Sequence, residues 1–570
     1  MNKMKMVYLT LVFHLRIAFA FSSGAETNVG RLPSYSNYQS PRFRWWWPSG
    51  FIEPDEISSE ISDILGAGFG GGEISDVYDR DYAWMDNKIY GFGQSCWIAA
   101  VERAYTDGNR LGGHVDMTLS PSWLTGFPGY TPDSLEIMKE LVHGQVFLEA
   151  GQTYSGTLPL PLAAPSGNQT GNIVHATPYL IAVLAARTTT SNDSSSVVDI
   201  FPDTVQVLSA SNHTLNWTAP SDGRYVVVAA YNQGTGQVQN MYDANPENAP
   251  VTYPHPIVDH FSPHGVEAGI KFWDSHILTD GIKEQIKRSN GSMFEDSLEL
   301  KLKQYWTTDL INEFRKRRGY DLTPFLLYVL QDTNTFRGKG TVASQILNDF
   351  YQTVSNLYTD YRIGGLTEWV NALGVRMRVQ PYTAESDSSY AASILDIPEG
   401  ESLGFDGDDD AFRVLATGRD IGGRTTILSD ELGAYMDEAY GVTWRFLLRT
   451  ANHDIALGVS QVVIHGHPYA YSQTSEWPGF APFTPLFSSN EFADAWGPRQ
   501  PHWMFAKQCS LYLKNAQGLL QESGPAIDVV ILNTDWGVTA SWADAGLNDG
   551  GYSYQFPTPL AFGSTQRQCR

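Results

Sequence analysis

The sequence has few cysteines, little positive charge and no long hydrophobic run beyond its first residues. Three cysteines, Cys96, Cys509 and Cys569, permit at most one disulfide, and their wide spacing is not that of a zinc site. A net charge of -24, with 62 acidic against 38 basic residues, disfavours binding to nucleic acid or to anionic membranes. No later segment reaches the roughly 20 apolar residues that a membrane-spanning helix needs. We therefore expect neither nucleic-acid nor membrane partners.

Residues 1–24 have the pattern of a secretory signal peptide. Lys3 and Lys5 precede an apolar stretch, which small residues follow. His14 and Arg16 interrupt that stretch, so a short membrane anchor is the alternative. Five N-x-S/T sequons, the acceptors of N-linked glycans, occur at Asn168, Asn192, Asn212, Asn216 and Asn290. The combination predicts a secreted, extracellular glycoprotein.

Outside residues 138–255, short apolar segments alternate with helical patterns, which is typical of a parallel sheet built from βα units. The predicted strands are 43–47, 70–74, 114–119, 292–294, 375–380, 394–397, 425–428 and 462–465. Helical patterns lie between most of them. Eight strands with intervening helices predict an α/β fold, a (β/α)8 barrel, whose two parts are residues 40–137 and 256–521.

Residues 138–255 interrupt this alternation. They contain alternating apolar segments separated by Gly, Ser, Asn and Thr, with no obvious helix, which predicts an inserted, all-β, sandwich-like domain. A long glycosylated loop without regular structure is the alternative. After residue 522 the pattern changes again, and 527–532 is a predicted strand. We expect residues 522–570 to be the start of a truncated C-terminal β domain.

Carboxylates follow two of the predicted barrel strands. Glu295, Asp296 and Glu299 come after segment 292–294, and Asp430 and Glu431 come after segment 425–428. Because the C-terminal ends of barrel strands meet at one mouth, we expect these side chains to share a pocket. Glycoside hydrolysis requires two carboxyl groups at one site, and this chemistry is the main functional prediction.

Other polar and aromatic residues near predicted strand ends are typical of a sugar-binding pocket, where aromatic faces pack on pyranose C–H groups and polar groups bind hydroxyls. The candidate substrate-binding residues are Asp116, Trp123, Tyr382, His465 and His467. The two histidines occupy alternate positions of one strand, so one should face the pocket and the other should face away. A transition metal at this pair would lack an obvious third ligand. No nucleophilic serine elbow, phosphate-binding loop or dinucleotide fingerprint competes.

The candidate carboxylates also have alternative structural interpretations. Glu299 and Glu431 are compatible with the first turn of a helix, where acidic side chains interact favourably with the helix dipole. Glu399 and Glu401 follow a proline and are compatible with a solvated turn. These alternatives stay open at the level of sequence.

Several segments, in this order, resemble glycoside hydrolase family 106, the secreted α-L-rhamnosidases and their fungal relatives. They are RFRWWWPSGFIEPDEISSEI, AGFGGGEISD, HVDMTLSPSW, MFEDSLE, KRRGYDLTPFL, IPEGES and ILSDELGAY, and the resemblance covers roughly residues 40–520. It implies a (β/α)8 catalytic domain that hydrolyses terminal α-L-rhamnosides with inversion, with Glu299 as general acid and Glu431 as general base. It also implies a calcium ion near the sugar hydroxyls, for which Glu399 is the candidate ligand.

The expected partner is therefore an oligo- or polysaccharide that carries terminal α-L-rhamnose or a related sugar. Inversion predicts carboxyl groups about 6.5–9.5 Å apart, which leaves room for the attacking water. Family members generally carry β-rich domains after the barrel, and here only about fifty residues follow it. A catalytically inactive or truncated carbohydrate-binding relative is the alternative.

Overall fold

The structure of the chain is a computed structural model. It describes residues 35–568 except 78–85, 168–174, 192, 194, 240–254, 331–334, 339–341, 383, 437–439, 471–479, 481, 484–491, 494 and 541–545. The predicted signal peptide (1–24) and the sequons at Asn168 and Asn192 lie outside the described residues. Within the described ranges, no helix has the length and apolar character that crossing a membrane requires.

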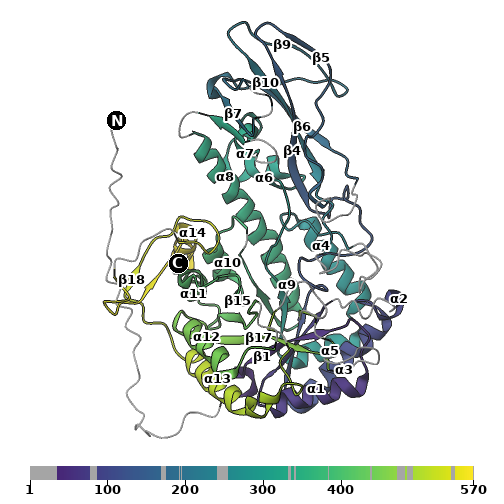
Figure 1. Cartoon of the computed structure of the whole chain (residues 1–570), viewed down its shortest axis with the longest axis vertical. Helices are drawn as coiled ribbons and strands as arrows, with labels where there is room; N and C mark the ends of the chain where they lie inside the picture. The colour runs from purple at the N-terminus through teal and green to yellow at the C-terminus, as the bar shows by residue number, and fades with distance from the viewer. Residues whose placement is uncertain are drawn as a thin grey trace.

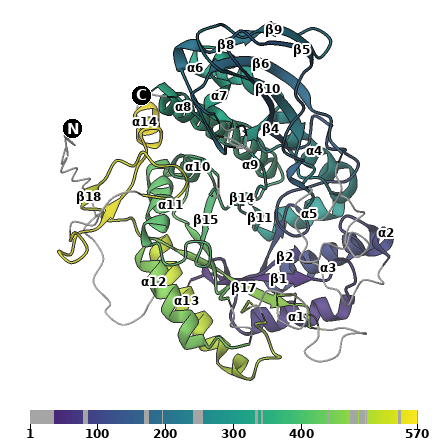
Figure 2. The same ribbon diagram turned by 45° about the horizontal axis from the view of Figure 1, so that its top comes forward.

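Eight parallel strands close into a barrel, which confirms the predicted (β/α)8 architecture (Figures 1 and 2). In chain order they are β1 (Arg42–Trp47), β2 (Gly71–Asp76), β3 (His114–Thr118), β11 (Ser292–Glu295), β14 (Arg376–Val379), β15 (Ile397–Glu401), β16 (Ser429–Leu432) and β17 (Gln461–Pro468). The ring closes because β1 pairs with both β2 and β17. Since all eight strands are parallel, their C-terminal ends open on one side, where such barrels carry their active sites.

Amphipathic helices cover the outside of the barrel (Figure 2). They include α1 (Pro54–Gly66), α3 (Ser95–Leu111), α4 (Pro263–Phe272), α5 (Asp280–Ser289), α9 (Gly364–Ala372), α10 (Ser388–Ile394), α11 (Asp409–Gly422), α12 (Trp444–Ala456) and α13 (Ala506–Gln521). In α1, Ile57, Ile61 and Ile64 recur at helical spacing and are fully buried, while the acidic residues of its first turn face solvent. The alternation of strand and helix read from the sequence therefore reflects real packing.

Two predicted barrel strands are wrong in position. Segment 394–397 predicts a strand, but α10 extends to Ile394 and β15 begins only at Ile397. Segment 425–428 predicts another, but β16 begins at Ser429. Both real strands carry inward-facing acidic residues, so apolar periodicity does not mark them. Glu399 and Glu431 consequently lie on strands, not in a solvated turn or in the first turn of a helix.

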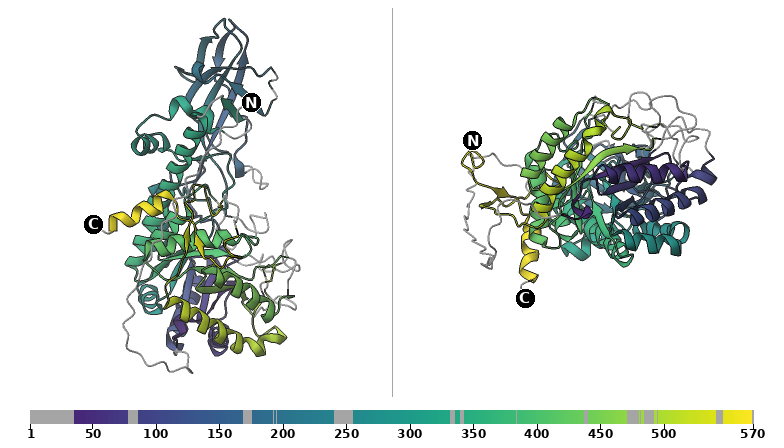
Figure 3. Two further views of the ribbon diagram at one scale, coloured as in Figure 1. Left: turned by 90° about the vertical axis from the view of Figure 1, so that its left-hand side faces the viewer. Right: turned by 90° about the horizontal axis from the view of Figure 1, so that it is seen from below.

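The inserted segment forms a five-stranded antiparallel sheet at one end of an elongated molecule (Figures 1 and 3). The strand order is β12–β4–β10–β6–β8, with β4 (Lys139–Leu148), β6 (Tyr179–Arg187), β8 (Gln206–Leu208), β10 (Tyr225–Gly234) and β12 (Tyr305–Trp306). Smaller pairs join β5 (Thr153–Thr157) to β9 (Thr214–Thr218), and β7 (Val197–Ile200) to β13 (Thr335–Gly338). Because β12 and β13 follow β11 in the chain, strands of the insert pair with residues from beyond the predicted boundary at 255, β4 with β12 and β7 with β13.

The central strand β10 is buried on both faces and ties the sheet to the rest of the molecule. Side chains alternate along a strand, so Val226 and Val228 enter the main core with α6 (Leu310–Arg318), α7 (Leu326–Val329) and α8 (Val342–Leu357). Val227 and Ala229 face the other way and pack with residues of the paired strands β5 and β9. The described part of the insert is therefore a folded β domain with two apolar faces, and the alternative of an unstructured loop is wrong for it.

The last part of the chain forms a small unit against α11. It contains the short strands β18 (Val529–Val530) and β19 (Tyr554–Gln555) and then α14 (Pro559–Gln568). The hydroxyl of Tyr554 donates to Asp410 at 3.1 Å, and the backbone N–H of Phe556 donates to Thr417 Oγ1 at 2.9 Å. These contacts fix the unit to the side of the barrel.

Candidate active site

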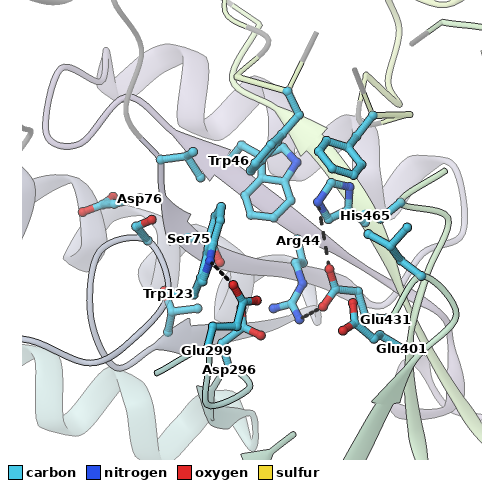
Figure 4. Close-up of a pocket in the computed structure, with 17 residues that line it drawn as sticks. Arg44, Trp46, Ser75, Asp76, Trp123, Asp296, Glu299, Glu401, Glu431 and His465 are labelled. Carbon is cyan, nitrogen blue, oxygen red and sulfur yellow. Dashed lines mark hydrogen bonds and ion pairs between the residues drawn. The ribbon is translucent and has the colours of Figure 1, made fainter. Parts of the chain in front are cut away.

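One pocket opens at the C-terminal mouth of the barrel (Figure 4). Its walls come from residues on β1, β2, β3, β15, β16 and β17 and from segments that include those after β3, β11 and β17. The side chains labelled in Figure 4 are Arg44, Trp46, Ser75, Asp76, Trp123, Asp296, Glu299, Glu401, Glu431 and His465. Both predicted catalytic residues therefore line the same pocket.

Arg44 holds Glu431 in its ionised form. Arg44 Nη2 donates to Glu431 Oε2, and Gln380 Nε2 donates to the same oxygen at 2.8 Å. Burial by itself raises the pKa of Glu431, but the charge of Arg44 and these hydrogen bonds outweigh burial, so the pKa is lowered below its usual value. At neutral pH Glu431 is a carboxylate that can accept a proton.

Glu299 lies beside Trp123, with Arg44 between it and Glu431 in Figure 4. Trp123 Nε1 donates to Glu299 Oε2 at 3.2 Å, and Ser297 Oγ donates to Oε1 at 3.4 Å. Burial raises the pKa of Glu299, the negative charge of Glu431 raises it further, and the two donors offset only part of this effect. Glu299 therefore keeps its proton to a higher pH than Glu431 does.

Two more carboxyl groups line the pocket. Asp296 follows β11 directly and Glu401 ends β15. Burial raises the pKa of each to about 8; repulsion from Glu431 adds to the shift, while Arg44 partly offsets it for Asp296. A protonated carboxyl can donate a hydrogen bond, so both are able to bind sugar hydroxyls. The sequence places both near strand ends, but it offers no sign that they stay protonated.

The predicted substrate-binding residues Trp123 and His465 line the pocket on its aromatic side. Trp123 stacks on Phe483, with ring centroids 6.1 Å apart. His465 contacts Trp46 and Phe483 with centroid separations of 4.8 Å and 5.1 Å. Burial lowers the pKa of His465 to about 4, so its ring is neutral at pH 7. This wall offers apolar faces to the C–H groups of a sugar and one neutral hydrogen-bonding ring.

Asp116 and Tyr382 lie outside the pocket, which corrects the prediction of direct substrate contact. Asp116 is fully buried inside the barrel on β3, where Arg42 Nη1 donates to its carboxylate at 2.5 Å. Tyr382 is also buried, and its hydroxyl donates to Gln380 Oε1 at 2.8 Å. Tyr382 therefore acts on the site through Gln380, which in turn donates to Glu431, and through its hydrogen bond with the pocket residue Glu401.

His467 faces away from the pocket, which corrects its assignment as a substrate-binding residue. It lies two positions after His465 on β17, where regular alternation would place both side chains on the same face. The register of β17 against β1 shifts between Ile464 and His467, however, and this irregularity turns the side chain of His467 to the outside of the barrel. There it packs against Phe43 and Trp503, with ring centroids 5.7 Å and 6.0 Å away. One histidine of the pair thus faces the pocket and the other faces away, but the register shift in β17 separates them, not the regular alternation on which the expectation was based.

Glu399 does not fit the predicted role of calcium ligand. Its Oε1 accepts from Arg44 at 3.1 Å and Gln380 at 3.2 Å, and its Oε2 accepts from Arg378 at 2.8 Å and Ser429 at 2.6 Å. Each oxygen of this carboxylate already accepts two hydrogen bonds, one of them from a guanidinium group, which leaves neither oxygen available to a divalent cation. In the part of the chain that the structure describes, no three acidic, histidine or cysteine side chains are grouped so that they could hold a metal ion.

Below the pocket, paired charges fill the barrel interior. Arg44 and Arg378 each pair with both Glu73 and Glu399, and all four side chains are buried. The ring of Phe294 lies 4.1 Å from the guanidinium of Arg44 and 4.7 Å from that of Arg378. Barrels of this type usually fill their interior with branched apolar side chains, so residue type alone did not reveal this network. Arg44 connects it to Glu431.

The sequence profile of a family described as alpha-L-rhamnosidase matches residues 35–185 and 177–558. Among solved structures, the chain is similar to a rhamnosidase from Novosphingobium sp. PP1Y, with 16% identity and a TM-score of 0.67 over 92% of this chain and 64% of that one. A β-galactosidase from Bacillus circulans sp. alkalophilus is more distant, with 9% identity and a TM-score of 0.41 over 91% of this chain and 65% of that one. No curated protein matches. The chain thus spans slightly under two thirds of the length of both structures.

Proposed function

This chain belongs to glycoside hydrolase family 106, the family described as alpha-L-rhamnosidase, and we propose that it hydrolyses terminal α-L-rhamnosides or closely related glycosides with inversion of configuration. In this proposal Glu299 is the general acid and Glu431 the general base. The observation that carries it is that both carboxyl groups line one pocket while their pKa values are shifted in opposite directions.

Glu299 donates its proton to the glycosidic oxygen as the bond between that oxygen and the anomeric carbon breaks. Its raised pKa keeps the proton available at the pH where Glu431 is ionised. Glu431 removes a proton from water while the water oxygen bonds to the anomeric carbon from the opposite face of the sugar. Because their surroundings shift the two pKa values in opposite directions, Glu299 fits the role of acid and Glu431 fits the role of base.

The neighbours of the pair support these roles. Arg44 favours the carboxylate of Glu431 before the reaction and favours loss of the accepted proton afterwards. Trp123 orients the carboxyl of Glu299 through its indole N–H. Asp296, Glu401 and the neutral ring of His465 remain to bind sugar hydroxyls.

The stereochemistry of the product tests the proposal. Aryl α-L-rhamnoside is hydrolysed in an NMR tube, and the anomeric proton of the first rhamnose released is recorded before mutarotation. Inversion predicts β-L-rhamnose as the first product. Release of the α anomer would contradict the base role of Glu431. Binding of rhamnose without hydrolysis of any rhamnoside would favour the alternative of an inactive carbohydrate-binding relative.

We also propose that the protein is secreted after removal of residues 1–24. The N-terminal pattern supports this, and so does the exposure of Asn212, Asn216 and Asn290, the sequon asparagines whose placement the structure describes in full. Mass spectrometry of protein from the culture medium, before and after enzymatic removal of N-glycans, measures both features. An intact Met1 and an unchanged mass would contradict the proposal.

A further inference from the structure

The segment that leads from the insert back toward the barrel lies directly behind Glu299. This return segment, residues 235–239, follows β10 and runs antiparallel to residues 255–257. The backbone N–H of Ile257 donates to Gln237 O at 3.0 Å, and that of Gln239 donates to His255 O at 3.1 Å. Gln237 and Gln239 occupy alternate positions, so both side chains project to one side. Their exposed fractions are only 2% and 4%.

Gln237 binds the backbone on either side of Leu300, immediately after the acid. The backbone N–H of Lys301 donates to Gln237 Oε1 at 2.9 Å, and Gln237 Nε2 donates to Glu299 O at 3.5 Å. Residues 296–302 form neither helix nor strand, so no regular hydrogen-bond ladder holds this stretch. The side-chain amide of Gln237 supplies part of the missing backbone hydrogen bonding.

Gln239 binds the loop that carries Trp123. Its Nε2 lies within hydrogen-bonding distance of three acceptors: Ser120 Oγ at 3.1 Å, Pro121 O at 2.7 Å and Leu124 O at 3.3 Å. Ser122 and Leu124 have φ values of 58° and 63°, a left-handed conformation that costs energy in a residue other than glycine. Such a loop persists only where its surroundings hold it, and Gln239 contacts it on both sides of Trp123.

We propose that Gln237 and Gln239 are positioning residues for the general acid. The return segment fixes Glu299 twice, through the backbone that follows it and through Trp123, whose indole donates to the Glu299 carboxylate at 3.2 Å. By this route the inserted β domain contributes to the geometry of the active site. The inference rests on the proposed role of Glu299 as general acid.

Leaving-group dependence separates this role from a merely structural one. The variants Gln237→Met and Gln239→Met remove the amide and keep a side chain of similar length. Dinitrophenolate leaves without protonation, whereas methanol needs the acid. We expect kcat/KM for methyl α-L-rhamnoside to fall at least about tenfold more than kcat/KM for the dinitrophenyl rhamnoside, because misplacement of the acid affects only the former. Equal losses on both substrates would overturn the proposal.

Gln233→Met is the matched control. Gln233 lies on β10, is 3% exposed and donates to Glu140 at 3.2 Å, and neither residue lines the pocket. Glu140 also accepts from Ser166 and from the backbone N–H of Lys303, and the variant keeps these bonds. The Gln233→Met variant loses a buried hydrogen bond comparable to those lost in the two test variants. We therefore expect kcat/KM to change by the same factor on both substrates. Selective loss on methyl rhamnoside in this control too would show that general loosening of the insert causes the effect.

The pH profile gives a second readout for Gln239→Met. The hydrogen bond from Trp123 lowers the pKa of Glu299, so loosening Trp123 lets that pKa rise further. The alkaline limb of kcat/KM should then move to higher pH. A limb that stays in place or moves to lower pH would count against an effect through Trp123.

Hydrogen exchange distinguishes failure of this inference from failure of the proposed function. If the wild type hydrolyses neither rhamnoside, the proposed function fails, and the contact itself is still measurable. The amide of Lys301 loses its acceptor in Gln237→Met and should exchange about tenfold faster, with no change in Gln233→Met. Unchanged exchange at Lys301 in Gln237→Met would overturn the proposed backbone contact.

Discussion

Replacing Arg44 with methionine should move the acidic limb of the pH–rate profile to higher pH. Arg44 is buried and donates to Glu431 Oε2, and its charge keeps the pKa of Glu431 lowered despite burial. Methionine keeps much of the side-chain length without the charge. Glu431 is then left with burial, which raises its pKa, and with two neighbours that lower it, His465 and the hydrogen bond from Gln380. The base becomes protonated at pH values where the wild type is active.

The size of this shift follows from the contacts of Glu431. An opposite charge in direct contact lowers a carboxyl pKa by about 1–3 units, and burial acts in the other direction once that charge is gone. We therefore expect the acidic limb of kcat/KM to rise by about 2 units. At pH values below this limb, each further pH unit lowers kcat/KM roughly tenfold.

The same substitution destabilises the fold. Glu73 and Glu399 lose one of their two guanidinium partners, although Arg378 still contacts both. Removal of one member of a buried ion pair typically costs about 3–5 kcal/mol of unfolding free energy. The folded pKa of Glu431 lies below its usual 4.5, so its pairing stabilises the fold above that pH and is lost as the pH falls through the folded pKa. The loss of unfolding free energy in Arg44→Met should therefore be larger near neutral pH than at acidic pH.

Arg42→Met is the matched control. Arg42 lies on the same strand, is equally buried and pairs with Asp116, which lies outside the pocket. It should lose comparable stability in denaturant titrations and keep the acidic limb of the wild type. The assay is kcat/KM measured over the accessible pH range for both variants. Equal shifts in both, or no shift in Arg44→Met, would show that Arg44 does not set the pKa of Glu431.

Further predictions concern the other pocket residues. Glu431→Gln should lower kcat at least about 100-fold and leave the calorimetric Kd for rhamnose within about threefold; an equal loss of binding would contradict its role as base. Burial raises the pKa values of Asp296 and Glu401 to about 8, so the fold should lose stability as pH rises from their usual values toward 8. Asp296→Asn and Glu401→Gln should each flatten this decline in urea unfolding, and a decline as steep as in the wild type would refute the assignment. His465→Phe should lower kcat/KM about tenfold while His467→Phe leaves it nearly unchanged; similar losses would mean that His467 also serves the site.

The sequence was sufficient for the barrel and for placing Glu299 and Glu431 at one mouth, whereas their roles as acid and base come from the family resemblance and stay a prediction. Alternating apolar strands and amphipathic helices have few ways to bury their apolar faces, and eight such units predict a closed parallel barrel. Parallel strands bring their C-terminal ends to one mouth whatever the loops do. Glu299 and Glu431 could therefore be assigned to one pocket from their positions after apolar segments, even though the segment predicted before Glu431 is not itself the strand.

Only the tertiary structure separated Glu431, a carboxylate at the pocket, from Glu399, a carboxylate locked between two arginines. Both are glutamates on neighbouring strands, where Glu399 pairs with Ser429 and Glu431 pairs with Glu401. Their roles differ because pKa and accessibility depend on the charges within a few ångströms. Those charges come from distant parts of the chain: Arg44, which holds Glu431 ionised, stands 387 positions before it. Local pattern encodes the elements, but the electrostatics of the site exist only once the folded barrel brings these residues together.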